Sequence, residues 1–131
     1  MLTTTGKDWA SSALFDSSGS RAAAATYIGV TANSTAPSAS DTTLTSEIVT
    51  AGGGLIRKAG TYAHTPGAST ATLTATFTAN GNDSLPVTLA KAGVFNASSA
   101  GSMPFESLLA PTAVVSAVGD SVTLTVTVTF S

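Results

Sequence analysis

Residues 120–131, DSVTLTVTVTFS, decide how this chain folds. Apolar side chains occupy every even position of the run 122–130, and Ser or Thr occupies every odd position of 121–129. Successive side chains of a β-strand point to opposite faces, so the segment predicts a strand with one apolar and one hydroxyl face. No charge, Pro or Gly interrupts it. Because a free edge of that composition invites aggregation, the strand must lie inside a sheet or be covered by another molecule.

The composition is that of a folded but almost uncharged protein. The 131 residues suit one domain, and 43% of them are hydrophobic. Charged residues make up 9%, against roughly 25% in an ordinary globular domain. A net charge of −2 provides little repulsion to keep copies apart. Direct nucleic-acid binding is not expected, because the five cations are scattered: Lys7, Arg21, Arg57, Lys58 and Lys91.

Other classes are excluded by what the sequence lacks. No apolar run approaches the ~20 residues of a membrane span. The chain has no cysteine, so disulfides and cysteine-based metal sites are excluded. The first five residues, MLTTT, lack the basic and apolar blocks of a secretory signal. We therefore expect folding and assembly in a cytoplasm.

The remaining pattern is that of an all-β domain. Short strands bounded by turn residues predict an antiparallel β-sandwich or flattened barrel, with sheets that are wet on one face. Thr42 to Val49 reads as a short helical turn, and Gly93 as a bulge or close approach. The expected strands are Ala24–Thr31, Leu55–Ala63, Thr70–Thr78, Leu85–Phe95, Met103–Leu109, which Pro111 ends, and 120–131.

The N-terminal segment predicts an arm. Gly6–Phe15 is the one good helix candidate, with Thr5 as its cap and Asp8 at the capping-box position. Such a short helix is marginal alone, so its apolar residues Trp9, Leu14 and Phe15 need a surface to dock on. Residues 16–21, DSSGSR, read as a flexible connector. The predicted division is an arm over 1–22 and a β-sandwich over 23–131.

No constellation of residues predicts catalysis, a cofactor or a metal. His64 is the only histidine and no nucleophile elbow surrounds a serine, so a surface histidine is expected. Glu47 and Glu106 do not form a recognisable acid–base pair, and Glu106 is expected to face solvent or a neighbour's Arg or Lys. The glycines 52–54 lack the Lys-Ser/Thr of a phosphate loop.

Three alternatives stay open. Asn80, Asn82 and Asp83 fit a hairpin turn, although together with Asp120 they could place oxygens around calcium. Arg57 and Lys58 are the only adjacent cations, and they read either as contacts to a partner or as a solvated strand face. The aromatic residues fit core packing or arm anchoring better than sugar stacking, because they are dispersed: Trp9, Tyr27 and Tyr62.

From Tyr27 onward the sequence resembles a family of small virion proteins of tailed bacteriophages. The stretches that carry the resemblance are YIGVT (27–31), TAP (35–37), DTTL (41–44), EI (47–48), LIR (55–57), TATF (74–77), AGVFNA (92–97), GSM (101–103) and the final strand 119–131, and GKDW (6–9) matches the usual opening. The resemblance implies a structural component of a phage head or tail. It implies no catalytic residues.

These observations predict a capsid-decorating (cement) protein with no enzymatic activity. Its expected partner is the major capsid protein, in a homo-oligomer or multi-copy lattice on the virion. Trp9, Leu14 and Phe15 are the expected arm anchors, and Arg57 and Lys58 the expected polar contacts. The alternative is a minor tail or fibre-base module that binds tail proteins or a host surface. A carbohydrate-binding adhesin module ranks third.

Overall fold

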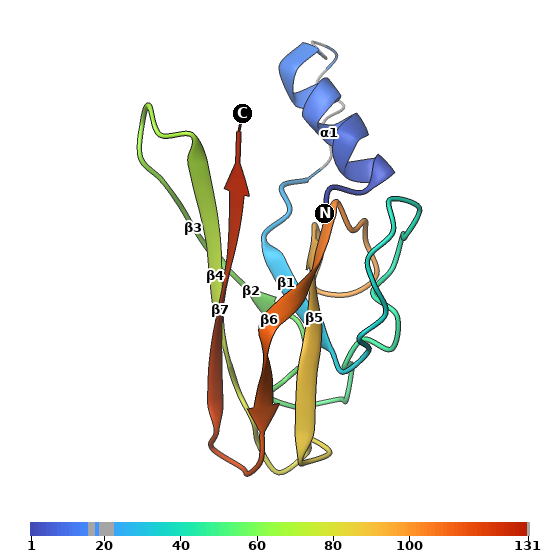
Figure 1. Cartoon of the computed structure of the whole chain (residues 1–131), viewed down its shortest axis with the longest axis vertical. Coiled ribbons are helices and arrows are strands. Elements are labelled where there is room, and N and C mark those ends of the chain that lie inside the picture. Colours follow the sequence, from blue (N-terminus) through green and yellow to red (C-terminus); the bar gives the residue numbers. More distant parts are fainter. Residues whose placement is uncertain (16–17, 19–22, 131) are drawn as a thin grey trace.

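A computed structural model describes residues 1–15, 18 and 23–130, and shows two antiparallel sheets packed face to face (Figure 1). One sheet has the strand order β2-β1-β5-β6 and the other the order β3-β4-β7. The predicted all-β class is therefore confirmed. The elements are α1 (Thr4–Phe15), β1 (Tyr27–Thr31), β2 (Lys58–Ala59), β3 (Thr61–His64), β4 (Thr70–Thr78), β5 (Val87–Phe95), β6 (Phe105–Val115) and β7 (Ser121–Thr129).

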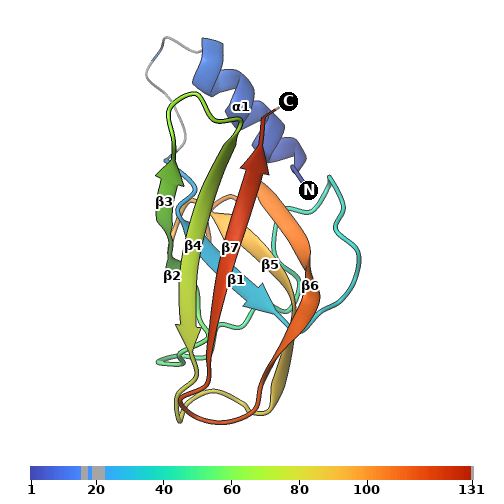
Figure 2. The same cartoon turned by 60° about the vertical axis from the view of Figure 1, so that its left-hand side comes forward.

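The core lies between the two sheets. Ile28 and Val94 on one sheet pack towards Leu73 and Phe77 on the other, and all four are at least nine-tenths buried. Figure 2 shows β4 and β7 side by side in front of the other layer. Burial of this apolar area, at roughly 25 cal/mol per Å², is what holds the layers together in a chain without cysteine.

The two sheets differ in how their outer faces are covered. β7 alternates between half-buried and exposed residues along its whole length, as the sequence predicts. β5 does not alternate, because Leu89 to Phe95 are buried on both faces. Part of the segment 32–57 covers its outer face, where Leu44 packs on Phe95 and Met103. The expectation of one wet face therefore holds for β7 and is wrong for β5.

The predicted strand Leu55–Ala63 is two strands that belong to different sheets. β2 pairs with β1, whereas β3 pairs with β4. Gly60 makes the crossing, and its N–H donates to Thr26 O at 2.7 Å. A side chain at Gly60 would meet Leu73 at 2.6 Å, so the chain passes against the core here.

Pro111 does not end a strand, contrary to the sequence prediction. β6 continues through it to Val115. The ladder between β5 and β6 is irregular at this point, with Leu89 opposite Ala113 and Lys91 opposite Leu108. A proline is tolerated there because β6 is an edge strand and no ladder hydrogen bond is required of Pro111. Of the two alternatives predicted for Gly93, the bulge is wrong, because the register shift falls between Leu89 and Lys91.

The start of the chain is part of the sandwich, which differs from the predicted arm over 1–22. Leu2 forms a β-bridge with Phe105, and Thr3 is fully buried. Thr3 Oγ1 donates to Met103 O at 2.8 Å and accepts the Gly6 N–H at 3.2 Å. Thr3 therefore caps α1, and the predicted capping role of Thr5 is wrong. Asp8 consequently does not occupy a capping-box position.

The prediction of a helical turn over residues 42–49 is also wrong, because no helix forms in this described part of the chain. The chain makes one isolated turn, closed by a hydrogen bond from the Glu47 N–H to Leu44 O at 3.1 Å. Thr31 Oγ1 donates to Thr45 O and Ser46 O and so holds the turn against β1. The predicted connector 16–21 lies outside the described residues except for Ser18.

Asp83 joins two loops at one end of the sandwich. Its carboxylate accepts the N–H groups of Gly54 and Asn80 at 2.8 Å and of Leu55 at 3.2 Å. Partial burial opposes ionisation, but these three backbone donors outweigh it and hold the pKa of Asp83 below its ordinary value. The hairpin-turn interpretation of residues 80–83 is thus supported, since the carboxylate already has its partners.

We expect Asp83→Asn to lower the free energy of unfolding at pH 7 by about 2 kcal/mol, because each hydrogen bond to a charged acceptor contributes about 1.5–3 kcal/mol. The pKa of Asp83 is lower in the folded state than its ordinary value in an unfolded chain. Its stabilisation is therefore complete above about pH 4 and is lost as the pH falls through the lowered pKa. Urea titrations between pH 7 and pH 2 should show the gap to wild type narrowing, and a constant gap would contradict this. Asp8→Asn, exposed on α1, is the control.

Candidate functional site

The outer face of β4 and β7 is a ladder of hydroxyl groups. The register places Thr70, Thr72, Thr74, Thr76 and Thr78 opposite Thr129, Thr127, Thr125, Thr123 and Ser121. Cross-strand hydrogen bonds join Thr74 to Thr125 at 3.1 Å, Thr76 to Thr123 at 2.8 Å and Thr78 to Ser121 at 2.7 Å between their side-chain oxygens. The result is a regular, uncharged surface of methyl and hydroxyl groups.

β7 is an edge strand of its sheet. β4 pairs with one side of it, and no other described strand pairs with its second side. Of the two alternatives that the sequence leaves open for this strand, the structure therefore excludes the interior of a sheet. The strand's nine residues, Ser121–Thr129, present a continuous row of backbone groups to whatever lies beside them.

The two ends of the ladder show which backbone groups are free. Phe130 N donates to Ser69 O at 2.7 Å, and Asp120 O accepts the Ala79 N–H at 2.9 Å. The N–H and C=O of one residue in an antiparallel strand point to the same side, and successive residues alternate. Even-numbered residues of β7 therefore bond to β4. The odd-numbered residues, which carry the hydroxyl side chains, point their backbone groups to the open edge.

The apolar face of β7 borders a groove between the sheets. The groove has a volume of about 500 Å³ and is lined by Leu73, Val94, Phe105, Val126 and Val128, among others. Tyr62 and Phe130 also line it and are 65% and 61% exposed. The sandwich is thus incompletely closed at the end where β7 terminates. The prediction of core packing is therefore wrong for Tyr62. It holds for Tyr27, which is half-buried and packs against the cluster that contains Phe95.

The predicted arm anchors lie on α1, at the same end of the molecule as the C-terminal end of β7 (Figure 1). Leu14 is 75% exposed and Phe15 is 83% exposed. Trp9 is half-buried. Leu14 and Phe15 therefore remain largely uncovered by their own chain, and their role as partner contacts stays a prediction.

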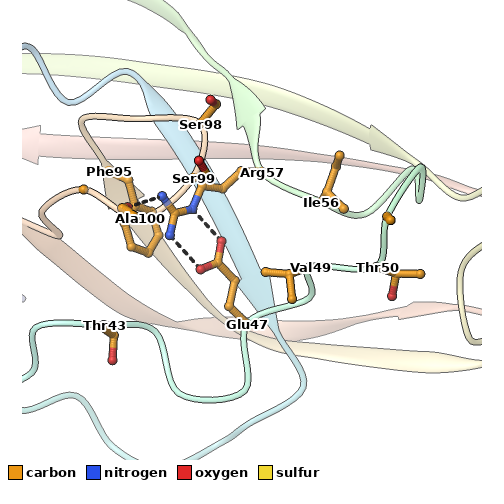
Figure 3. Close-up of a pocket in the computed structure, with 12 residues that line it drawn as sticks. Thr43, Glu47, Val49, Thr50, Ile56, Arg57, Phe95, Ser98, Ser99 and Ala100 are labelled. Atoms are coloured by element: carbon orange, nitrogen blue, oxygen red, sulfur yellow. Dashed lines mark hydrogen bonds and ion pairs between the residues drawn. The ribbon is translucent and has the colours of Figure 1, made fainter.

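Arg57 has an internal role that its sequence context does not reveal. Figure 3 shows its guanidinium between Glu47 and Phe95. Nε and Nη2 donate to the two Glu47 carboxylate oxygens at 2.6 and 2.7 Å, and Nη1 donates to Ala97 O and Ala100 O at 2.9 and 2.7 Å. The guanidinium carbon lies 3.4 Å from the Phe95 ring centroid. The guanidinium donors are thus largely occupied by groups of the same chain, which leaves few of them for a partner. The alternative prediction, that Arg57 lies on a solvated strand face, is wrong. Lys58 is half-buried in β2.

Two glycines make the space for this stack. Gly29 and Gly93 are opposite each other in the β1–β5 ladder. A side chain at Gly29 would meet Glu47 Oε1 at 2.6 Å and Arg57 Cγ at 3.2 Å, and one at Gly93 would meet Phe95 at 3.0 Å. The predicted close approach at Gly93 is therefore confirmed. The available sequence signal for this cluster was a glycine within each of two predicted strands, Gly29 and Gly93, because a missing side chain leaves room for large groups such as Arg57 and Phe95.

Glu106 is buried and pairs within its own chain, so the prediction that it faces solvent or a neighbour is wrong. Lys91 Nζ lies 3.5 Å from Glu106 Oε2, and both residues are 2% exposed. Burial raises the pKa of Glu106, and a hydrogen bond with the Asp41 side chain raises it further. That hydrogen bond lowers the pKa of Asp41. Glu106 therefore holds its proton more firmly than a free glutamic acid, whereas Asp41 loses its proton more readily than a free aspartic acid.

The other predicted chemical groups do not come together. His64 is exposed, and its Nδ1 lies 2.9 Å from Thr70 O. Within residues 1–15, 18 and 23–130, His, Asp and Glu form no group of three or more that could hold a metal ion. In the same part of the chain, no helix is both long and apolar enough to cross a membrane.

Comparison of the chain with protein-family models, curated proteins and solved structures found no match. The resemblance to tailed-phage virion proteins therefore stays a prediction, carried by the residues quoted above.

The two adjacent cations should differ sharply in their effect on stability. Arg57→Met leaves the Glu47 carboxylate, on a side chain that is 11% exposed, without its partner. We expect a loss of about 3 kcal/mol in the free energy of unfolding, because an unpaired charge in a poorly solvated site is costly. Adding Glu47→Gln to this variant should recover part of the loss.

Lys58→Met is the matched control and should change stability by less than about 1 kcal/mol. Thermal and urea unfolding measure both variants. Equal effects of the two substitutions would contradict the internal role of Arg57.

Proposed function

We propose that this chain is a non-enzymatic structural protein of a tailed-phage particle and that it decorates the capsid shell. The observation that carries the proposal is the open edge of β7, nine residues long and without charge, proline or glycine. Natural monomers blunt such edges with charges, prolines or bulges. An unblunted edge is consistent with a protein that is covered by neighbours where it works.

The hydroxyl ladder supports the same function. Two surfaces of this kind can pack closely without stripping water from charged groups, which is the costly step in burying ions. Four of the chain's charged residues are used internally, in the Arg57–Glu47 pair and the Lys91–Glu106 pair. What remains outside is a polar, nearly neutral surface that suits repeated subunit contacts.

The exposed end of α1 supplies a second contact. Leu14 and Phe15 are the two most exposed large apolar side chains among the described residues. In the proposed arrangement they dock on an adjacent capsid subunit while the sandwich rests on the shell. A stable interface buries at least about 1,000 Å², and repetition over a lattice strengthens modest contacts through avidity. Bridging contacts between capsomers would oppose the outward pressure of packaged DNA.

The engagement of the titratable groups favours a role without catalysis. A general acid or base needs a titratable group within reach of a substrate. Asp83 is held by three backbone donors, and the Glu47 carboxylate is occupied by Arg57. Glu106 is buried against Lys91. These residues stabilise the fold rather than face a substrate.

The capsid proposal predicts that the double variant Leu14→Ser, Phe15→Ser binds phage particles at least tenfold more weakly. The particles would be made without the wild-type protein, and binding would be measured by co-sedimentation. Its stability should not fall, because both side chains are exposed. Val118→Ser is the control and should bind normally, because Val118 is 64% exposed but lies in the turn between β6 and β7 rather than on α1.

The number of copies per virion then distinguishes a capsid decoration protein from a tail component. Quantitative mass spectrometry of virions should find hundreds of copies for a capsid decoration protein. A few dozen copies or fewer would indicate a tail component, and absence from purified virions would overturn the phage assignment.

A further inference from the structure

β7 is the longest uninterrupted edge strand in the described chain, and nothing in it blunts that edge. The other edge strands are β2, with two residues, β3, with four, and β6. β6 is long but carries Pro111 within its irregular stretch. Such irregularities, prolines and short lengths are the usual protections of an edge. Among residues 1–15, 18 and 23–130, β7 alone offers nine consecutive residues without one of them.

The sequence of β7 is complementary to itself when two copies run antiparallel. If Thr125 faces Thr125, then Thr123 faces Thr127 and Ser121 faces Thr129. Val122 then faces Val128, and Leu124 faces Val126. Hydroxyl residues meet hydroxyl residues on one face, and apolar residues meet apolar residues on the other. No charged residue lies within the paired segment.

The backbone independently requires the same parity. Only the odd-numbered residues of β7 have N–H and C=O groups free of β4, as the bonds of Phe130 and Asp120 show. In the register centred on Thr125, every odd residue meets another odd residue, which forms hydrogen-bonded pairs. A register that mixed odd with even residues would leave these groups unpaired and would place hydroxyls opposite valines.

We propose that β7 pairs antiparallel with β7 of a second copy of this chain, with the Thr125 residues facing each other on a two-fold axis. Two three-stranded sheets thereby become one six-stranded sheet. The new ladder adds on the order of ten backbone hydrogen bonds. It extends the hydroxyl face from the rungs of Thr74–Thr125 and Thr76–Thr123 into the second copy.

A second copy is the occupant that these features favour. An unrelated peptide could add to the edge by backbone bonds alone, but it would not explain the match of both faces about one central residue. An isologous contact requires a self-complementary surface. The pairing uses the same edge that carries the proposed function, yet it involves this chain alone, so it can be tested without any particle.

The first test is the oligomeric state of the purified chain, measured by sedimentation velocity over a range of concentrations. Wild type should form dimers. Thr125→Pro should weaken dimerisation at least tenfold, because it removes an N–H at the open edge and none that bonds to β4. Thr125→Lys should do the same, since it sets two ammonium groups opposite each other.

Thr74→Lys is the matched control for the charge. Thr74 lies in the same rung and on the same face as Thr125, but one strand away from the edge. It should change the dissociation constant by less than threefold. Circular dichroism checks that the variants fold. If Thr125→Pro does not fold, the comparison of Thr125→Lys with Thr74→Lys tests the proposed dimer instead. A wild type that stays monomeric at millimolar concentration would overturn the proposal, as would a dimer indifferent to Thr125→Lys.

A cysteine series tests the register, because the natural chain has no cysteine. Paired residues in a hydrogen-bonded antiparallel position have Cα atoms about 5.5 Å apart, within disulfide range. Thr125→Cys should therefore give a covalent dimer on mild oxidation. Thr123→Cys alone should not, since the two positions would lie about 14 Å apart along the strands.

Mixing Thr123→Cys with Thr127→Cys should restore the cross-link. A strong cross-link of Thr123→Cys with itself, or none in the mixture, would overturn this register. Failure of these tests would leave particle binding through α1 untouched, so it can be told apart from failure of the proposed function.

Discussion

The pairing of β4 with β7 is the interaction on which the rest of the structure depends. Its register sends Leu73, Phe77 and their neighbours into the core and sets the threonines in rungs on the outside. A shift by one residue would exchange the two faces, so burial of the apolar set fixes the register. The same pairing occupies only the even-numbered backbone groups of β7. The core and the open edge are therefore two consequences of one ladder.

The two sheets also differ in role, because one stabilises the fold and the other offers surfaces for contacts with neighbours. The central strands β1 and β5 of the β2-β1-β5-β6 sheet are covered on both faces, and the outer face of this sheet holds the ion pairs of Arg57 with Glu47 and of Lys91 with Glu106. The β3-β4-β7 sheet keeps an uncovered hydroxyl face and an open edge. A chain with few charges thus uses several of them to fix a long loop in place, and leaves a neutral surface for neighbours.

The sequence predicted what depends on local periodicity and missed what depends on contacts between distant segments. The alternation in β4 and β7 identified both strands to within a few residues, and the exposed end of α1 followed from its composition. The burial of Glu106 could not be read from its neighbours, because Lys91 and Asp41 approach it from other segments. The prediction that Pro111 ends its strand failed because only the fold shows that Pro111 lies in an edge strand. Local sequence likewise does not say whether a regular strand is central or peripheral.

Residue-resolved amide hydrogen exchange of β7 tests the central claim most directly. In dilute solution the amides of Val122, Leu124, Val126 and Val128 should be protected, because they bond to β4, whereas those of Thr123, Thr125 and Thr127 should exchange rapidly. At high concentration the threonine amides should become protected as well. Equal protection of both sets in dilute solution, or threonine amides that stay unprotected when the chain is concentrated, would contradict the account.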